Sequence, residues 1–186
     1  MRWIIKEWPY AALFSAGFLL LLLPFISALG LSLALIYLQL PLYMIHQFEE
    51  HDKDRFRTFA NNVIGGGKEA FTPGAIFFIN SVGVWGLDLV ALYLAFYVNL
   101  ALGLVAIYLP LVNAVTHIVM CVALRRYNPG LWTAALLFLP LGVWALAVVT
   151  KASQATWGMQ ACALGGAVLV HVGIMVYVKT RLRRLK

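Results

Sequence analysis

The chain has 186 residues, of which 63% are hydrophobic and only 11% are charged. Soluble domains usually carry about 25% charged residues, so this composition excludes an ordinary water-soluble core. The formal net charge of +7 would suit a nucleic-acid-binding protein only if the basic residues formed one face, but they follow the ends of apolar segments instead. We therefore expect a protein of the lipid bilayer with no nucleic-acid partner.

Six apolar segments are candidates for crossing a membrane, since about 20 apolar residues span the hydrocarbon core, and the first of them is short. We place them at residues 9–24, 29–48, 73–97, 100–124, 129–150 and 157–178. They occupy most of the chain, so the sequence predicts a single transmembrane domain over residues 1–186, an all-α polytopic bundle of about six helices. A polar loop, residues 51–72, separates the second helix from the third.

Two helix starts carry recognisable signals. Thr72-Pro73 and Asn128-Pro129 each place an N-capping side chain before a proline, which predicts that a helix begins at each position. The first apolar segment has a second interpretation, because basic residues precede a short apolar stretch, as they do in cleaved signal peptides. The sequence therefore leaves open whether this segment is retained.

The basic residues lie almost entirely on one side of the predicted bundle. Six spans place both termini on the same side, which then receives 13 of the 14 Lys and Arg residues and leaves only Lys151 opposite. Because basic residues are retained in the cytoplasm during insertion, we expect cytoplasmic termini and a cytoplasmic loop 51–72. The predicted location is the inner (plasma) membrane, as a multi-pass protein.

The few polar side chains inside the predicted helices are the first candidates for function, because an ionisable group at mid-helix in a bilayer costs about 2.5 kcal/mol or more. His46, Glu49 and Glu50 lie at i, i+3 and i+4 of the second helix and share one face. Asn113 and His117 lie at i and i+4 of the fourth helix. Each of the two helices therefore presents a polar face.

Depth in the membrane relates these groups to polar residues on other helices. At about 1.5 Å rise per residue, Asn80 of the third helix and His171 of the sixth fall at the same cytoplasmic level as His46 and His117. Asp88 is the exception, because it lies near or beyond the bilayer midplane. The sequence thus predicts one polar layer built by four helices.

These residues and their order resemble the HXXEE-domain family of integral membrane proteins. The resemblance covers most of the chain and is carried by His46-Gln47-Phe48-Glu49-Glu50, Pro73-Gly74 followed by Ile79-Asn80, Asn113-Ala114-Val115-Thr116-His117, and Tyr127-Asn128-Pro129-Gly130. It implies a membrane enzyme with metal-type ligands. It implies no substrate.

The spacing supports a metal site independently of the resemblance. His46-x-x-Glu49-Glu50 has the spacing of the inverted zincin motif HxxEH, with Glu50 in place of the second histidine. By this analogy His46 and Glu50 bind a divalent metal and Glu49 acts as the base. His117 completes a set of two histidines and one carboxylate, which suits Zn²⁺ or Fe²⁺ and leaves positions open for water or substrate. More than about 7 Å between these side chains would exclude a single ion held by bonds of roughly 2 Å.

Three further residues receive roles at this stage. Asn80 and Asn113 are expected to orient water or a carbonyl group, and His171 is a candidate additional ligand. Simpler explanations compete with all of these roles. Polar groups at a helix end can be solvated at the membrane interface, and deeper ones can form interhelical hydrogen bonds, each usually worth about 0.6–2 kcal/mol.

Three classes of function fit the pattern. The first is a metal-dependent membrane enzyme, hydrolase-like or of the non-haem-iron type, acting on a lipidic or amphipathic substrate at the cytoplasmic side. The second is a proton- or cation-coupled transporter that uses the His/Glu cluster, with Asp88 as its best support. The third is a non-catalytic scaffold. The nearly apolar outer halves of the helices favour the enzyme, and a homo-oligomer remains open in every case.

Overall fold

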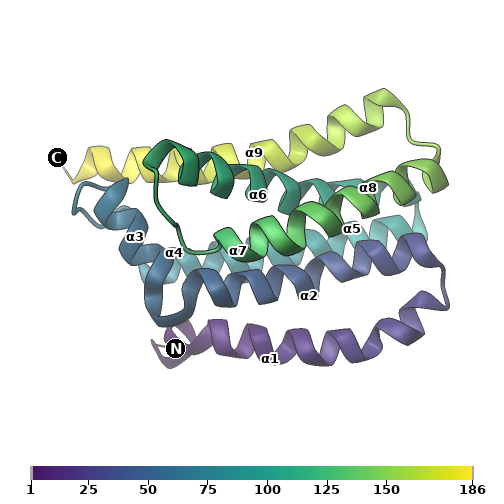
Figure 1. The fold of residues 1–186 in the computed structure, drawn as a ribbon, viewed down its shortest axis with the longest axis horizontal. Helices are drawn as coiled ribbons and strands as arrows, with labels where there is room; N and C mark the ends of the chain where they lie inside the picture. Colours follow the sequence, from purple (N-terminus) through teal and green to yellow (C-terminus); the bar gives the residue numbers. More distant parts are fainter. Residues whose placement is uncertain (1, 186) are drawn as a thin grey trace.

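The computed structural model describes residues 2–185, and this part of the chain is all helical (Figure 1). It contains six helices that are long and apolar enough to cross a membrane, which confirms the predicted bundle. In three of the spans one uninterrupted α-helix forms the membrane-crossing part: α1 (Arg2–Ser27), α2 (Leu31–His51) and α9 (Trp157–Arg184). The others join consecutive segments: α4 (Pro73–Phe77), η2 (Phe78–Val84) and α5 (Trp85–Tyr97); η3 (Leu100–Gly103) and α6 (Leu104–Leu124); α7 (Leu131–Thr133), η4 (Ala134–Phe138) and α8 (Leu139–Ser153).

Helix α2 is the centre of the bundle. It packs against α1, α5, α6 and α8, and its buried side chains point in nearly all directions around the helix axis. A helix in such a place is expected to be apolar on most sides, and α2 is so apart from Gln39 and the polar residues near its C-terminal end. Helix α1 lies along α2 at the periphery, where the fully buried Ala12 and Ala16 allow the two backbones to approach closely.

Both chain ends, α3 (Arg55–Val63) and the connection between α6 and α7 lie at the same end of the bundle (Figure 1). We call this the charged end, because every Lys and Arg within residues 2–185 belongs to it except Lys151. Lys151 lies in the last turn of α8, at the opposite end. The one-sided charge predicted from sequence is therefore also one-sided in three dimensions.

The predicted loop 51–72 contains structure of its own. A short segment, η1 (Asp52–Asp54), breaks the helix after α2, because Lys53 and Asp54 adopt φ angles of 53° and 61°. The chain then forms α3 and returns to the membrane. Asn61 fixes this return, since its Oδ1 accepts the Phe71 N–H at 2.8 Å and its Nδ2 donates to the Phe71 carbonyl at 3.1 Å.

The helix start predicted at Thr72-Pro73 is confirmed. The Thr72 hydroxyl accepts the N–H of Ala75 at 3.1 Å, and Pro73 occupies the first turn of α4. Proline fits there because the first N–H groups of a helix have no intrahelical partner.

Two other helix boundaries differ from those predicted from the sequence. Helix α1 runs through Pro9 and Pro24 instead of being bounded by them, as membrane helices tolerate proline when the freed backbone groups find other partners. The fifth span begins at Leu131 rather than Pro129, and Gly130, with φ of 94°, precedes it. Asn128 does not cap this helix, because its side chain has a tertiary partner, His117.

Two of the spans contain π-helical segments, η2 and η4. Segments of this kind widen the helix locally and occur frequently at functional sites. Asn80 lies in η2, and η4 begins directly after Thr133. Both segments therefore border the polar layer predicted from the sequence.

Candidate metal centre

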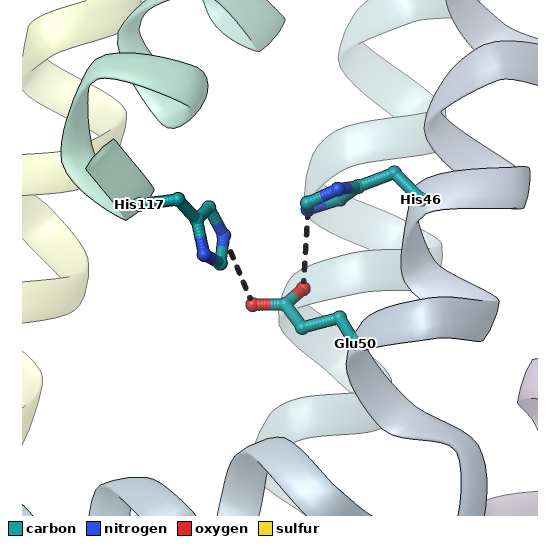
Figure 2. A group of neighbouring side chains, drawn as sticks. All are labelled: His46, Glu50 and His117. Carbon is teal, nitrogen blue, oxygen red and sulfur yellow. Dashed lines mark ion pairs between the residues drawn. The ribbon is translucent and has the colours of Figure 1, made fainter. Parts of the chain in front are cut away.

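Three of the four side chains predicted as metal ligands meet near the charged end of the bundle. His46 and Glu50 stand one turn apart on α2, and His117 reaches them from α6 (Figure 2). One ligand atom from each lies within 4.8 Å of the others. The His46 Nε2–Glu50 Oε2 distance is 3.6 Å, and the His117 Nε2–Glu50 Oε1 distance is 3.5 Å.

These distances suit a single ion. Two ligand atoms, each about 2 Å from a tetrahedral Zn²⁺, stand roughly 3.3 Å apart. The three side chains also fall well inside the limit of about 7 Å that would exclude a shared metal. We call His46, Glu50 and His117 the metal-ligand group; its geometry requires little movement to close around an ion.

The metal-ligand group is buried. The exposed fractions of His46, Glu50 and His117 are 0%, 7% and 3%. Within the described residues, the basic groups within 4 Å of the Glu50 carboxylate are His46, His51 and His117, with no Lys or Arg among them. Burial of a carboxylate costs several kcal/mol unless a positive charge compensates it. The charge of Glu50 therefore has to be compensated by one of these imidazoles in its protonated form or by a bound cation.

The hydrogen bonds of His117 fix which ring nitrogen carries the proton. Asn128 Nδ2 donates to the His117 carbonyl at 2.9 Å, so the other side-chain atom, Oδ1, is the one that faces His117 Nδ1 at 2.6 Å. An amide oxygen only accepts, so His117 Nδ1 must carry the hydrogen. The lone pair of Nε2 is then directed into the metal-ligand group.

A second chain of hydrogen bonds fixes which ring nitrogen of His46 carries the proton. The Thr133 hydroxyl donates to Glu49 Oε2 at 2.6 Å, and Thr133 Oγ1 lies 2.8 Å from His46 Nδ1. With its hydrogen committed to Glu49, the Thr133 oxygen accepts from His46 Nδ1–H. His46 therefore also presents the lone pair of Nε2 to Glu50. Outer partners of this kind commonly orient histidine ligands of metals.

The atoms that face one another in the metal-ligand group are thus acceptors: two imidazole lone pairs and a carboxylate. Acceptors at this separation repel one another unless a cation lies between them. Two groups that can donate lie close to these atoms: Asn113 Nδ2 is 3.1 Å from His46 Nε2, and His51 Nε2 is 3.1 Å from Glu50 Oε2. An ion held by all three side chains would replace Asn113 as the partner of His46 Nε2.

Glu49 points away from the metal-ligand group and toward the start of α7. Its Oε2 accepts the backbone N–H of Thr133 at 2.7 Å, and its Oε1 accepts the N–H of Trp132 at 3.2 Å and the Tyr127 hydroxyl at 2.8 Å. Burial and this hydrogen bond raise the pKa of Tyr127 to about 12, so its phenol stays protonated and donates. Glu49 therefore caps a helix N-terminus, where a negative charge is stabilising.

Gly130 closes the metal-ligand group from the side of the α6–α7 connection. A Cβ atom built on Gly130 would lie 2.7 Å from His117 Cε1 and 2.8 Å from His46 Cε1. The backbone can therefore pass between the two rings only where no side chain is present. The φ angle of 94° independently favours glycine.

A family model described as a protein of unknown function with HXXEE motif matches residues 37–145. The match covers more than half of the chain and includes α6, the start of α8 and the site itself. The chain belongs to the HXXEE family. No curated protein and no solved structure matches it.

The residues of the HXXEE motif contact different parts of the bundle. His46 and Glu50 enter the metal-ligand group, and Glu49 caps α7. The intervening Gln47 is fully buried and turns to the third span, where its Nε2 donates to Asn80 Oδ1 at 3.0 Å. One turn of helix thus connects α2 to three neighbouring segments.

Asn80 lies in this network rather than in the metal-ligand group. Its Nδ2 donates to the Ile76 carbonyl at 2.9 Å, so both polar atoms of the side chain are engaged. Trp85 completes the network, because its Nε1 donates to Gln47 Oε1 at 2.6 Å. These bonds join η2 to α2 at the level of the site.

A cavity of about 260 Å³ adjoins the metal-ligand group, and we call it the inner cavity. Glu50, His117 and Asn113 form part of its wall, and aliphatic side chains of α9 form the largest share of the rest. His171 also lines this cavity. The structure does not bring it into the metal-ligand group: its Nδ1 donates to the Ala167 carbonyl of its own helix at 2.9 Å.

Asp88 lies apart from all of these residues. It is 2% exposed, and neither carboxylate oxygen has a hydrogen-bond partner within the described part of the chain. An unpaired buried carboxyl group is costly, so the fold does not gain stability from it.

The sequence missed three residues that shape the site: Thr133, Asn128 and Gly130. For Asn128 and Gly130 the sequence predicts a helix start and a part of the family resemblance but no role at the site, although a polar residue and a glycine in a loop at the level of His117 are a weak signal for it. Thr133 gave no signal, because a threonine in the first turn of a membrane helix is ordinary. Only the packing of α7 against α2 brings it to His46.

Proposed function

We propose that this HXXEE protein is a metal-dependent integral membrane enzyme that acts on a lipidic or amphipathic substrate. One observation supports it above the others. A buried group of two histidines and a carboxylate, with its acceptor atoms turned inward, opens onto a mainly apolar cavity. Buried acceptors need a cation, and an apolar cavity beside them suits the apolar part of a substrate.

His46, Glu50 and His117 are the proposed ligands. Two histidines and one carboxylate suit Zn²⁺ or Fe²⁺ and leave positions free for water or substrate. When bound, such an ion supplies Lewis-acid activation of water or of a substrate oxygen. Hydrolysis and iron-dependent oxidation are both compatible with this ligand set.

The remaining polar residues receive supporting roles in the proposal. Asn113 lines the inner cavity beside His46, so its amide can donate to a substrate oxygen as negative charge develops. Glu49 is assigned a positioning role in place of the base suggested by the zincin analogy. Its carboxylate holds Thr133, and Thr133 holds His46 in the tautomer that a metal requires.

The substrate is proposed to enter from the bilayer. Val168, Val172 and Met175 of α9 line the inner cavity and are 40%, 47% and 50% exposed. Lining residues that are this exposed support a cavity that opens toward lipid past α9. With the charged end in the cytoplasm, as the distribution of basic residues favours, the site would serve the inner leaflet.

Lipid turnover tests the proposal. The purified protein is reconstituted in nanodiscs made from a bacterial polar lipid extract, loaded with Zn²⁺ or Fe²⁺, and the lipids are compared by mass spectrometry with those around His117→Ala. We expect a lipid species that is consumed only by the wild type and only with metal. Lipid profiles that are identical for the two proteins with both metals would overturn the assignment.

A second candidate function is a proton- or cation-coupled transporter, and Asp88 is the observation that favours it. A buried carboxyl group with no hydrogen-bond partner at this depth is a common feature of proton pathways. The test is flux of protons into liposomes that contain the wild type or Asp88→Asn. Transport requires a flux that this substitution abolishes, whereas the enzyme requires none.

A further inference from the structure

A second hollow lies close to the inner cavity, at the charged end of the bundle. It has a volume of about 500 Å³, and we call it the outer pocket. It is lined by Lys6 and Trp8 of α1, Asp54 and Arg57 around the start of α3, and Gly74 of α4, together with neighbouring residues. It is therefore formed where three segments meet at the membrane surface.

The two hollows share a wall. His51 and Ile76 line both the inner cavity and the outer pocket, and each is 5% exposed. The His51 ring extends from one to the other: it packs against Trp8 at a centroid distance of 5.0 Å, and its Nε2 lies 3.1 Å from Glu50 Oε2. One imidazole and one aliphatic side chain thus separate a metal ligand from the outer pocket.

The chemistry of the two hollows differs. The inner cavity is mainly aliphatic and borders the lipid-facing side of α9. The outer pocket contains charges of both signs, and Arg57 Nε donates to Asp54 Oδ1 at 2.9 Å. Apolar side chains such as Ile5 and Pro9 complete its lining, and its charged groups offer water and small hydrophilic species the polar contacts that a purely apolar hollow lacks. Neither water nor a metal ion can reach a buried site readily through hydrocarbon.

We infer that the outer pocket is the aqueous entrance to the metal-ligand group and that His51 and Ile76 form its gate. The inference rests on the proposed function, because it assumes that the metal-ligand group binds an ion. It adds a second access route: the apolar substrate reaches the site from the bilayer past α9, whereas water and the metal ion reach it from the charged end. It also gives α1 a role, since Trp8 forms the outer side of the His51 gate.

Gly74 offers a way to close the entrance without altering the gate. A Cβ atom at Gly74 would meet nothing within 4 Å, so a cysteine there fits the fold and faces open space. The test protein carries Gly74→Cys in a background in which Cys121 and Cys162 are replaced by serine. A bulky reagent, benzyl methanethiosulfonate, then fills the pocket, and dithiothreitol removes it again. Gly86→Cys is the matched control, because Gly86 belongs to the same span, has equally open surroundings and lines neither hollow.

The measured quantity is the rate at which Co²⁺ enters the metal-free protein, followed by the visible absorption of the bound ion. We expect modification of Gly74→Cys to slow Co²⁺ entry about tenfold or more, with full recovery after reduction and an unchanged final amount bound. Modification of Gly86→Cys should leave the rate unaltered. Equal rates for modified and reduced Gly74→Cys, with Co²⁺ bound in both, would overturn the entrance alone. Absence of Co²⁺ binding in the unmodified protein would overturn both the entrance and the metal-ligand group.

Discussion

Substitution of Gly130 by alanine should disable the metal site without removing any ligand. The new Cβ atom would lie 2.7 Å from His117 Cε1, 2.8 Å from His46 Cε1 and 3.1 Å from His117 Nε2, whereas ordinary contact begins at 3.4 Å. The two rings must therefore move by about 0.6–0.7 Å, or the connection before α7 must move away from them. Metal–ligand distances tolerate deviations of only about 0.2 Å. We expect Zn²⁺ affinity to fall about 10–100-fold or more.

Gly30→Ala is the matched control for this experiment. Gly30 also has a positive φ, 115°, but a Cβ atom there would meet nothing within 4 Å, and it lies at the opposite end of α2 from the site. Both substitutions should cost about 1–3 kcal/mol of backbone strain, and only Gly130→Ala should weaken metal binding. Competition with a chromophoric chelator gives the two affinities. Wild-type affinity in Gly130→Ala, or an equal loss in both variants, would refute the packing of Gly130 between the histidine rings.

Three further predictions follow from the contacts of the site. Glu50→Gln should lower Zn²⁺ affinity more than about 100-fold and Glu49→Gln by only about 10–100-fold, so equal losses in chelator competition would contradict their separate roles. Thr133→Val leaves His46 Nδ1 without its acceptor and should lower the free energy of unfolding by about 1–3 kcal/mol, which a lower melting temperature in detergent would show. An unchanged melting temperature would contradict this hydrogen bond. Asp88→Leu removes an unpaired buried carboxyl group and should raise the melting temperature, whereas a lower one would show that Asp88 has a stabilising partner.

The six spans could be predicted because the bilayer imposes a simple rule on the sequence. Backbone groups in hydrocarbon must be satisfied within the segment, so each long apolar run becomes a helix. The meeting of His46, Glu50 and His117 could also be predicted, because helix periodicity gives the face of each helix and the rise per residue gives the depth. These rules are local and need no knowledge of the packing.

The direction of Glu49 could not be predicted in this way. Successive residues on a helix point about 100° apart, so Glu49 and Glu50 cannot both bind the same ion. The zincin analogy made Glu50 the ligand and Glu49 the base, but it did not show that the Glu49 carboxylate turns to α7. The choice depends on where α7 begins and on the free N–H groups that it offers. The role of Asn128 could not be predicted either. Its position suggests a helix cap, but its side chain bonds His117 instead. His171 shares the depth of the site, but its ring bonds its own helix.

The metal content of the protein tests the metal-ligand group most directly. Wild type and His117→Ala are purified in parallel without chelators, and Zn, Fe and Mn are counted per chain by inductively coupled plasma mass spectrometry, with His171→Ala as the control histidine outside the metal-ligand group. We expect about one metal ion per chain in the wild type and in His171→Ala, held by a single site, and almost none in His117→Ala. Equal metal content in wild type and His117→Ala, or no metal in the wild type after incubation with Zn²⁺ and Fe²⁺, would contradict the proposed centre.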